Sequence, residues 1–214
     1  MYIAVEGVIG VGKTTLARML QPRFEADLQL EVFEENPFLA DFYGDRVRYA
    51  FQTQIFFLLS RYHQQRRSVR EVLDSGRNLL TDYTFAKDAL FASINLSGDE
   101  LEMYYRVHEA LGEKVRLPDL IVYLQAETTV LMQRIALRDR SYERNMEIDY
   151  IASLNQAYND HFMHHYQGPP VLTISTNQLD FVKNIADLDL IEAQIRQELS
   201  TLLKQDSFAI GNGR

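Results

Sequence analysis

The chain has 214 residues, 46% of them hydrophobic and 24% charged, a composition that fits one folded domain and excludes a largely disordered protein. Its 22 basic and 30 acidic residues give a formal net charge of −8, which disfavours general binding to nucleic acids or anionic membranes. The lack of cysteine excludes disulfides and thiolate chemistry, and the short apolar runs with no basic leader lead us to expect a cytoplasmic enzyme.

Strand-like and helix-like segments alternate along the chain. The predicted strands are short apolar runs, in chain order residues 2–5, 28–33, 78–81, 120–124 and 171–174. The clearest predicted helices cover residues 13–24, 46–73, 128–138, 148–165 and 187–203. Because buried strands joined by helices pair in parallel, we predict an α/β fold with a doubly wound, five-stranded parallel sheet. We expect a single domain over residues 1–204, with a lid at about 138–147 and a flexible tail at 205–214.

Residues 7–14, GVIGVGKT, are a complete match to the phosphate-binding loop G-x-x-x-x-G-K-[ST], placed between a strand and a helix as that motif requires. Its glycines let the backbone wrap around phosphates, and its N–H groups point at the anion from a helix N-terminus. A glycine-rich turn without a ligand is the alternative. The residues expected to hold ATP here are Gly7, Gly10, Gly12, Lys13, Thr14 and Thr15, with the Thr14 hydroxyl also on Mg²⁺. No Asn-Lys pair is present to read guanine as in a GTPase.

Glu31 lies toward the carboxyl end of the second predicted strand, the edge at which an open α/β sheet binds its ligand. A carboxylate at this edge could accept the proton of a hydroxyl that attacks the γ-phosphate. Glu34 and Glu35 are rival candidates, and any of the three could instead be a solvated turn residue.

The long helix predicted over residues 46–73 carries an apolar face that is interrupted by Gln54 and Arg61. Buried amide and guanidinium groups need hydrogen-bond partners. These partners could be other protein groups, with Asp88 as a candidate counter-charge for Arg61, or the polar edge of a nucleobase.

Arg134 and Arg138 are four residues apart on one predicted helix, and Arg140 follows its end. An exposed basic face is the plain interpretation, whereas a phosphate-transfer enzyme would use such arginines as a clamp on the transferring oxygens. Asp82 follows the third predicted strand, where a carboxylate commonly organises Mg²⁺ in this kind of fold. A strand-end cap is the alternative for Asp82.

Together these motifs resemble the deoxynucleoside kinase family, especially its bacterial deoxyguanosine/deoxyadenosine kinase branch, and they imply a P-loop kinase-type fold. Residues 31–37, EVFEENP, are similar to the family's Glu-Pro-Val-type segment. The resemblance implies that Glu31 is the general base toward the nucleoside 5′-hydroxyl. It likewise implies that Gln54, Arg61 and Asp88 recognise the base.

The same resemblance assigns residues to the sugar, the phosphates and the donor base. It places Tyr43 and Glu143 at the sugar 3′-hydroxyl. It makes Arg134, Arg138 and Arg140 the lid arginines around the phosphates, and Asp180 and Phe181 the loop over the adenine of ATP. Two departures stand out: Tyr83 occupies the usual arginine position, and Val32 replaces the expected proline.

The resemblance implies transfer of the ATP γ-phosphate, with Mg²⁺, to the 5′-hydroxyl of a deoxynucleoside for nucleotide salvage. It favours a purine, deoxyguanosine or deoxyadenosine, and a homodimeric protein. A thymidylate-like nucleoside-monophosphate kinase is the nearest rival, although Glu31 and Tyr83 argue against it. A noncatalytic ATP-sensing module would explain the phosphate-binding loop but not the extra pocket.

Overall fold

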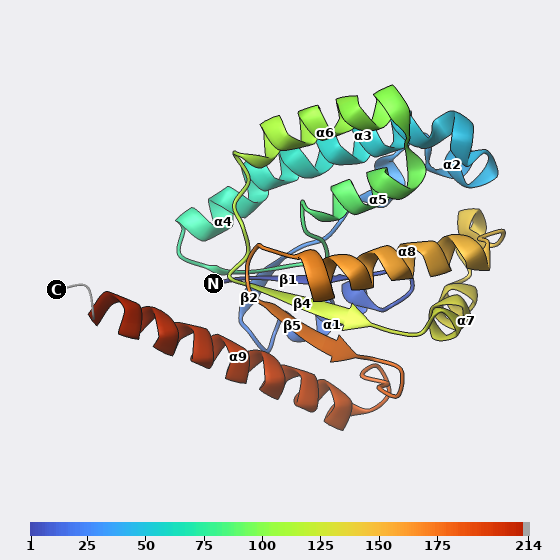
Figure 1. The fold of residues 1–214 in the computed structure, drawn as a ribbon. Helices are drawn as coiled ribbons and strands as arrows, with labels where there is room; N and C mark the ends of the chain where they lie inside the picture. Colours follow the sequence, from blue (N-terminus) through green and yellow to red (C-terminus); the bar gives the residue numbers. More distant parts are fainter. Residues whose placement is uncertain (212–214) are drawn as a thin grey trace.

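The computed structural model describes residues 1–211, apart from the side chains of residues 34 and 206–211. Its five strands form one sheet in the order β2-β3-β1-β4-β5, and every neighbouring pair is parallel. The strands are β1 (Tyr2–Gly7), β2 (Ala26–Gln29), β3 (Asn78–Thr81), β4 (Leu120–Gln125) and β5 (Val171–Ser175). The predicted doubly wound α/β fold is confirmed, and Figure 1 shows helices on both sides of the sheet.

The central strand β1 is buried along its whole length because it has a paired neighbour on each edge and helices over each face. Its side chains alternate between the two faces. Ile3 and Val5 belong to the main core, whereas Tyr2 and Ala4 pack in a second cluster that includes Val72. This strand ends at Gly7, so the phosphate-binding loop leaves from the middle of the sheet.

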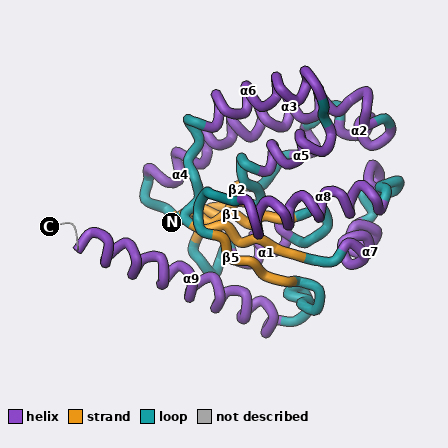
Figure 2. Tube along the Cα trace, viewed as in Figure 1, coloured by secondary structure: helices purple, strands orange, loops and turns teal. Residues whose placement is uncertain are grey.

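One group of helices covers the upper face in Figure 1, and the last helix lies below the sheet. In chain order the helices are α1 (Lys13–Leu20), α2 (Leu39–Gly44), α3 (Arg46–Gln64), α4 (Arg70–Asp74), α5 (Lys87–Asn95), α6 (Gly98–Gly112), α7 (Thr128–Arg138), α8 (Ile148–Asp160) and α9 (Ile185–Gly211). Figure 2 shows α3, α5 and α6 as a layer separated from α9 by the strands. No helix in the described part of the chain is long and apolar enough to cross a membrane.

The long helices contain local changes in winding that the sequence pattern does not predict. The predicted helix 46–73 is α3 and α4 joined by a π-helical turn at Gln65–Val69. The predicted helix 148–165 is likewise α8 followed by a π-helical turn at His161–His165. Neither π-turn interrupts the run of helix, so the predicted extents of both are close to the observed ones.

The second strand differs from its prediction: it covers Ala26–Gln29 rather than residues 28–33. Strand β2 is an edge strand that pairs with β3, and this ladder ends where Gln29 meets Thr81. Glu31 therefore lies in the loop beyond the strand, where its backbone N–H donates to the Asp82 carboxylate at 2.7 Å. The length of β3, not the local apolar pattern, sets the end of β2.

Two helix ends also differ from their predictions. Helix α1 ends at Leu20 rather than near residue 24, because Pro22 cannot donate a backbone hydrogen bond. Helix α9 begins at Ile185 and continues to Gly211, so the described chain has helix where we expected the start of a tail after Lys204.

Candidate active site

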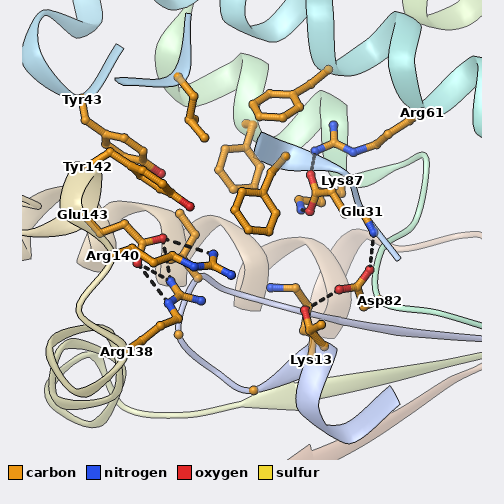
Figure 3. Close-up of a pocket in the computed structure, with 18 of the residues that line it drawn as sticks. Lys13, Glu31, Tyr43, Arg61, Asp82, Lys87, Arg138, Arg140, Tyr142 and Glu143 are labelled. Atoms are coloured by element: carbon orange, nitrogen blue, oxygen red, sulfur yellow. Dashed lines mark hydrogen bonds and ion pairs between the residues drawn. The ribbon is translucent and has the colours of Figure 1, made fainter. Parts of the chain in front are cut away.

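A pocket opens at the carboxyl edge of the sheet, between the phosphate-binding loop, helices α3 and α5, and the predicted lid (Figure 3). Most of the residues predicted from the sequence meet here. Those that line the pocket are Gly10, Gly12, Lys13, Thr14, Thr15, Glu31, Tyr43, Gln54, Arg61, Asp82, Arg138, Arg140 and Glu143. Residues that are up to 133 positions apart thus share one cavity because all five strands run in the same direction.

Lys13, the first residue of α1, is held against the phosphate-binding loop. Its ammonium donates to the backbone carbonyls of Gly7 at 2.7 Å and Val8 at 3.1 Å. Burial, and after it the nearby Lys87 ammonium, lower the pKa of Lys13 to about 8. A phosphate in the loop would relieve both effects, because its negative charge favours the protonated lysine.

The backbone of the phosphate-binding loop requires glycine at Gly12. This residue has a φ of 107°, and a Cβ atom there would lie 2.9 Å from the ring of Phe181. Both the left-handed backbone and the close aromatic ring exclude a larger side chain. Phe181 thus packs directly on the loop that is predicted to hold the donor phosphates.

Thr14 and Asp82 form an oxygen-rich corner beside Lys13. The Thr14 hydroxyl donates to one Asp82 carboxylate oxygen, while the other oxygen accepts the backbone N–H of Glu31. Mg²⁺ in phosphate-transfer sites is held by one or two protein oxygens together with phosphates and water. The hydroxyl and the carboxylate therefore fit a Mg²⁺ ion that is completed by a bound nucleotide.

Glu31 lines the pocket and is flanked by two cations. One carboxylate oxygen contacts Arg61, and the other accepts a hydrogen bond from Lys87 at 2.5 Å. Burial by itself would raise the pKa of Glu31, but the positive charges of Arg61 and Lys87 outweigh it and hold that pKa well below its ordinary value. The carboxylate is ionised at neutral pH. Of its rivals, Glu35 is exposed and the side chain of Glu34 lies outside the described residues.

Gln54, Arg61 and two aromatic rings from α3 and α5 line one part of the pocket. Gln54 is only 3% exposed and comes from α3. Phe57 and Phe91 line the pocket with it, and the Arg61 guanidinium lies 4.9 Å from the centre of the Phe57 ring. The flat walls and the amide edge suit a planar heterocycle.

Asp88 lies behind this wall and is fully buried. It forms an ion pair with Arg61, which confirms the counter-charge expected from the sequence. Arg61 thus contacts carboxylates on both sides, Asp88 and Glu31, and both contacts orient its guanidinium.

The predicted lid closes the opposite side of the pocket. Arg138 donates to both carboxylate oxygens of Glu143, at 2.7 and 2.6 Å from one nitrogen. One guanidinium nitrogen of Arg140 lies 3.7 Å from a carboxylate oxygen of Glu143, and the guanidinium carbon is 4.0 Å from the centre of the Phe33 ring. Glu143 therefore gathers both arginines at the mouth of the pocket, where Figure 3 shows them facing Lys13 and Glu31 across the cavity.

Tyr43 joins the lid through its aromatic ring. The ring stacks on Tyr142 with a centroid distance of 5.9 Å and an interplanar angle of 15°. Burial is the main cause that raises the pKa of Tyr43 well above its ordinary value, so the hydroxyl keeps its proton. Tyr43 and Glu143, the two residues predicted at the sugar 3′-hydroxyl, line the pocket on this same side.

Comparison with known proteins identifies the family. The family model described as deoxynucleoside kinase matches residues 3–200. The chain belongs to the deoxynucleoside kinase family. It is 34% identical over 199 residues to a deoxyguanosine kinase of Bacillus subtilis, which covers 92% of this chain and 96% of that protein. It is 31% identical over 192 residues to a deoxyadenosine kinase of Dictyostelium discoideum, a match that covers 87% of this chain and 77% of that protein.

Solved structures agree with the fold of this family member. A deoxyadenosine kinase from M. mycoides, with products dCMP and a flexible dCDP bound, matches with a TM-score of 0.80 at 24% sequence identity. The match covers 92% of this chain and 100% of that one. Another structure of the M. mycoides enzyme, with dATP bound, also has a TM-score of 0.80. The resemblance drawn from the sequence motifs is confirmed at the level of family and fold.

Arg134 lies elsewhere than the sequence predicts for a lid arginine of this kinase family member. Its guanidinium donates to the Thr176 hydroxyl and carbonyl at 2.9 and 2.7 Å and to the Val11 carbonyl at 3.2 Å. It lines a neighbouring pocket with Asp180 and Phe181, on the far side of the phosphate-binding loop. Because protein acceptors already hold it, Arg134 braces the phosphate-binding loop and does not line the pocket of Glu31 with Arg138.

The residues that sequence reasoning missed include Lys87, which lines the pocket, and Glu6, whose carboxylate accepts the N–H of Gly7 at the start of the phosphate-binding loop. Each is an unusual residue type for its position in the sequence, and that mismatch could have revealed it. Lys87 begins α5, although the positive end of the helix dipole disfavours a cation there. Glu6 is a fully buried carboxylate inside the apolar strand β1. Tyr83, which departs from the family's arginine, is buried and does not line the pocket.

Proposed function

We propose that this deoxynucleoside kinase family member transfers the γ-phosphate of ATP to the 5′-hydroxyl of a deoxynucleoside, giving a deoxynucleoside monophosphate and ADP. The position of Glu31 carries this proposal. Its carboxylate lies between Lys13 and Asp82 on one side and Arg61 on the other (Figure 3), and Gln54 lines the same cavity. An acceptor whose base lies against Gln54 and Arg61 has its sugar hydroxyl at Glu31.

The donor side of the proposal rests on the phosphate-binding loop. The loop N–H groups and Lys13 would bind the β- and γ-phosphates, and Asp180 and Phe181 would border the adenine. Thr14 and Asp82 would hold Mg²⁺, which, when bound, neutralises part of the charge on the donor phosphates.

In the transfer step, the bond from the 5′-oxygen to the γ-phosphorus forms while the bond to the β,γ-bridging oxygen breaks and leaves its electron pair on ADP. Glu31 accepts the hydroxyl proton. Because its pKa is depressed, Glu31 is ionised at neutral pH and acts chiefly by holding the hydroxyl in line with the phosphorus. Arg138 and Arg140 leave Glu143 and contact the transferring oxygens, while Glu143 and Tyr43 hold the 3′-hydroxyl.

We further propose that the acceptor is a purine, deoxyguanosine or deoxyadenosine. The Gln54 amide supplies both a donor and an acceptor, and the Arg61 guanidinium supplies donors, so the pair matches the polar edge of a purine. The names of the relatives from Bacillus subtilis and Dictyostelium discoideum support the same class.

Steady-state assays of ADP release test the activity and the acceptor together. The four deoxynucleosides and thymidine monophosphate are compared over the same range of concentrations, each with a no-acceptor control. We expect release that depends on an added nucleoside, with at least tenfold higher kcat/KM for a purine. Faster turnover with thymidine monophosphate would favour a nucleoside-monophosphate kinase, and release that never depends on an acceptor would favour an ATP-sensing module.

The homodimer implied by the family resemblance and the cytoplasmic location expected from the short apolar runs remain predictions. Sedimentation equilibrium measures the first, and cell fractionation measures the second. Closure of residues 138–147 over bound ATP is a third proposal of this kind.

A further inference from the structure

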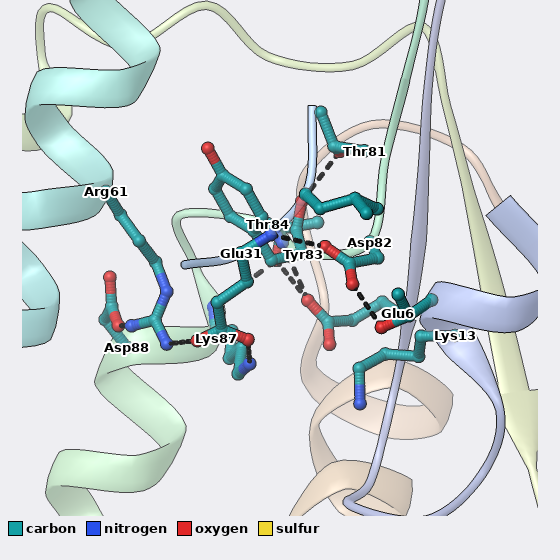
Figure 4. A network of polar contacts seen from close by, with 12 residues as sticks. Glu6, Lys13, Glu31, Arg61, Thr81, Asp82, Tyr83, Thr84, Lys87 and Asp88 are labelled. Atoms are coloured by element: carbon teal, nitrogen blue, oxygen red, sulfur yellow. Dashed lines mark hydrogen bonds and ion pairs between the residues drawn. The ribbon is translucent and has the colours of Figure 1, made fainter. Parts of the chain in front are cut away.

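Lys87 is a buried ammonium that lines the pocket beside Glu31. Its side chain is 7% exposed, and its nitrogen lies 2.5 Å from one carboxylate oxygen of Glu31. Figure 4 shows Lys87 beside Glu31, with Lys13 and Asp82 on the phosphate side of the same network. A buried lysine costs free energy unless its charge and its N–H groups find partners.

The ion-pair cluster around Glu31 contains two carboxylates, Glu31 and Asp88, and two cations, Arg61 and Lys87. Arg61 already contacts the other oxygen of Glu31 and is itself paired with Asp88. Lys87, by contrast, has Glu31 as its one carboxylate partner within the described residues. When Glu31 takes up a proton, the charge of Lys87 is no longer balanced by that carboxylate.

The ammonium also has unused hydrogen-bonding capacity. A lysine carries three N–H donors. One of these reaches Glu31, and the remaining two have no acceptor among the side chains and backbone groups that the structure describes. Lys87 lines the same cavity as Lys13, and it is close enough to contribute, after burial, to the lowered pKa of Lys13. The Phe91 ring, whose centre lies 5.5 Å from the Lys87 nitrogen, is the other contact of this ammonium in the described part of the chain. Lys87 and Lys13 thus bring two positive charges to one cavity, and these charges favour an anion there.

A buried framework fixes the position of Lys87 relative to the phosphate-binding loop. The Glu6 carboxylate accepts the N–H of Gly7 at 2.9 Å and, with its other oxygen, the N–H and hydroxyl of Thr84 at 2.8 and 2.9 Å. The Thr84 hydroxyl accepts the backbone N–H of Lys87 at 3.3 Å. One carboxylate in β1 therefore connects the start of the loop to the first turn of α5, and the donor groups are preorganised.

We propose that Lys87 is a catalytic residue of phosphoryl transfer: its ammonium contacts Glu31 and a non-bridging oxygen of the γ-phosphoryl group as that group moves to the acceptor. This role rests on the proposed function. Lys87 keeps its own proton throughout, while the hydroxyl proton goes to Glu31 and the electron pair of the broken bond goes to ADP. The lysine supplies charge where the three equatorial oxygens carry it in the transition state.

Three variants test the catalytic contact: Lys87→Gln, Lys87→Arg and, as a matched control, Lys114→Gln at an exposed lysine. We expect kcat to fall at least ~100-fold in K87Q, the loss typical of removing one transition-state donor. The KM for the acceptor and the Kd for ATP should stay within about threefold. The kcat of K87R should be at least tenfold higher than that of K87Q, and the kcat of K114Q should equal that of the parent protein. A K87Q enzyme with parental kcat would overturn the proposal.

A double variant separates this role from mere positioning of Glu31. If Lys87 acts only through Glu31, then Glu31→Gln combined with Lys87→Gln turns over as slowly as Glu31→Gln alone. Direct contact with the phosphoryl group predicts a further loss of about tenfold or more. Equal rates for E31Q and the double variant would reject a catalytic role.

A binding measurement keeps this test independent of the proposed acceptor. Aluminium fluoride mimics the transferring phosphoryl group, so calorimetry with ADP, Mg²⁺ and fluoroaluminate reports contacts that are specific to that group. We expect fluoroaluminate to tighten ADP binding at least tenfold in the parent protein and not in K87Q, with binding of ADP alone unchanged. If K87Q retains this tightening of ADP binding, or if the parent protein lacks it, the proposed contact of Lys87 with the phosphoryl group is wrong. Failure of every deoxynucleoside as acceptor counts instead against the proposed function.

Discussion

The environment of Glu31 shows how one carboxylate can be both fixed and reactive. Its two oxygens contact cations from α3 and α5, and its backbone N–H is held by Asp82. These contacts lower its basicity but orient both oxygens. A base of this kind contributes by geometry more than by proton affinity.

Replacing Glu31 with Gln should therefore impair the chemical step and spare donor binding. We expect kcat to fall by about 10² to 10⁴-fold, while the Kd for ATP changes less than threefold, because Lys13, Thr14 and the loop N–H groups are untouched. Glu35→Gln, at an exposed carboxylate four residues away, is the matched control and should keep parental kcat. Near-normal turnover of E31Q would remove Glu31 from this role.

At the scale of elements, helix α6 supports the loop that leads into α5. His108 on α6 stacks on the ring of Phe85 with centroids 4.6 Å apart, and its Nε2 lies 3.2 Å from the Phe85 carbonyl oxygen. Burial lowers the pKa of His108 below its ordinary value of 6.5, although the backbone carbonyl opposes this shift. The folded protein thus favours the neutral imidazole of His108. This ring packs on Phe85, which is two residues before Lys87.

This depressed pKa gives folding stability a defined pH dependence. Below pH 6.5 the unfolded chain binds a proton at His108 before the folded protein does, so the free energy of unfolding should decrease as pH falls from 7 to 5. Urea unfolding at several pH values measures it. His108→Gln should show a smaller decrease, with a remainder from His161, whose pKa burial also lowers. Equal slopes for H108Q and the parent protein would contradict the assignment.

The elements also show what the sequence could predict. Strand β3 and helix α7 have the predicted limits because an apolar run between polar ends, or a helical repeat, is local information. The end of β2 and the guanidinium of Arg134 depend on partners far along the chain. The same distinction explains the site: Gln54 and Arg61 share a helix face that the pattern reveals, whereas the contact of Lys87 with Glu31 joins residues 56 positions apart.

At the scale of the whole molecule, α9 closes the face of the sheet opposite the α3 and α6 layer (Figure 1). Its buried side chains include Ile191 and Ile195, which belong to the main core. Ion pairs of Arg23 with Asp189 and Glu192 hold its first half against the segment after α1. The apolar contacts should provide most of the stabilisation, because ion pairs near the surface contribute little.

Ile195→Ala should consequently lower the free energy of unfolding by about 3 kcal/mol, the usual cost of a cavity at a fully buried isoleucine. Leu203→Ala on the same helix is the matched control. Leu203 is 72% exposed, and its truncation should change stability by less than ~0.5 kcal/mol. Urea denaturation of both variants measures the difference, and equal effects would show that α9 is not docked through Ile195.

Asp82 connects the site for the nucleotide with the site for the acceptor. One of its oxygens holds the Thr14 hydroxyl, and the other holds the peptide N–H of Glu31. A divalent ion that binds Asp82 must compete with both contacts. Binding of the nucleotide with its metal ion therefore acts directly on the backbone that positions Glu31. The two substrates are then thermodynamically linked through a single side chain, and each must change the affinity for the other by the same factor.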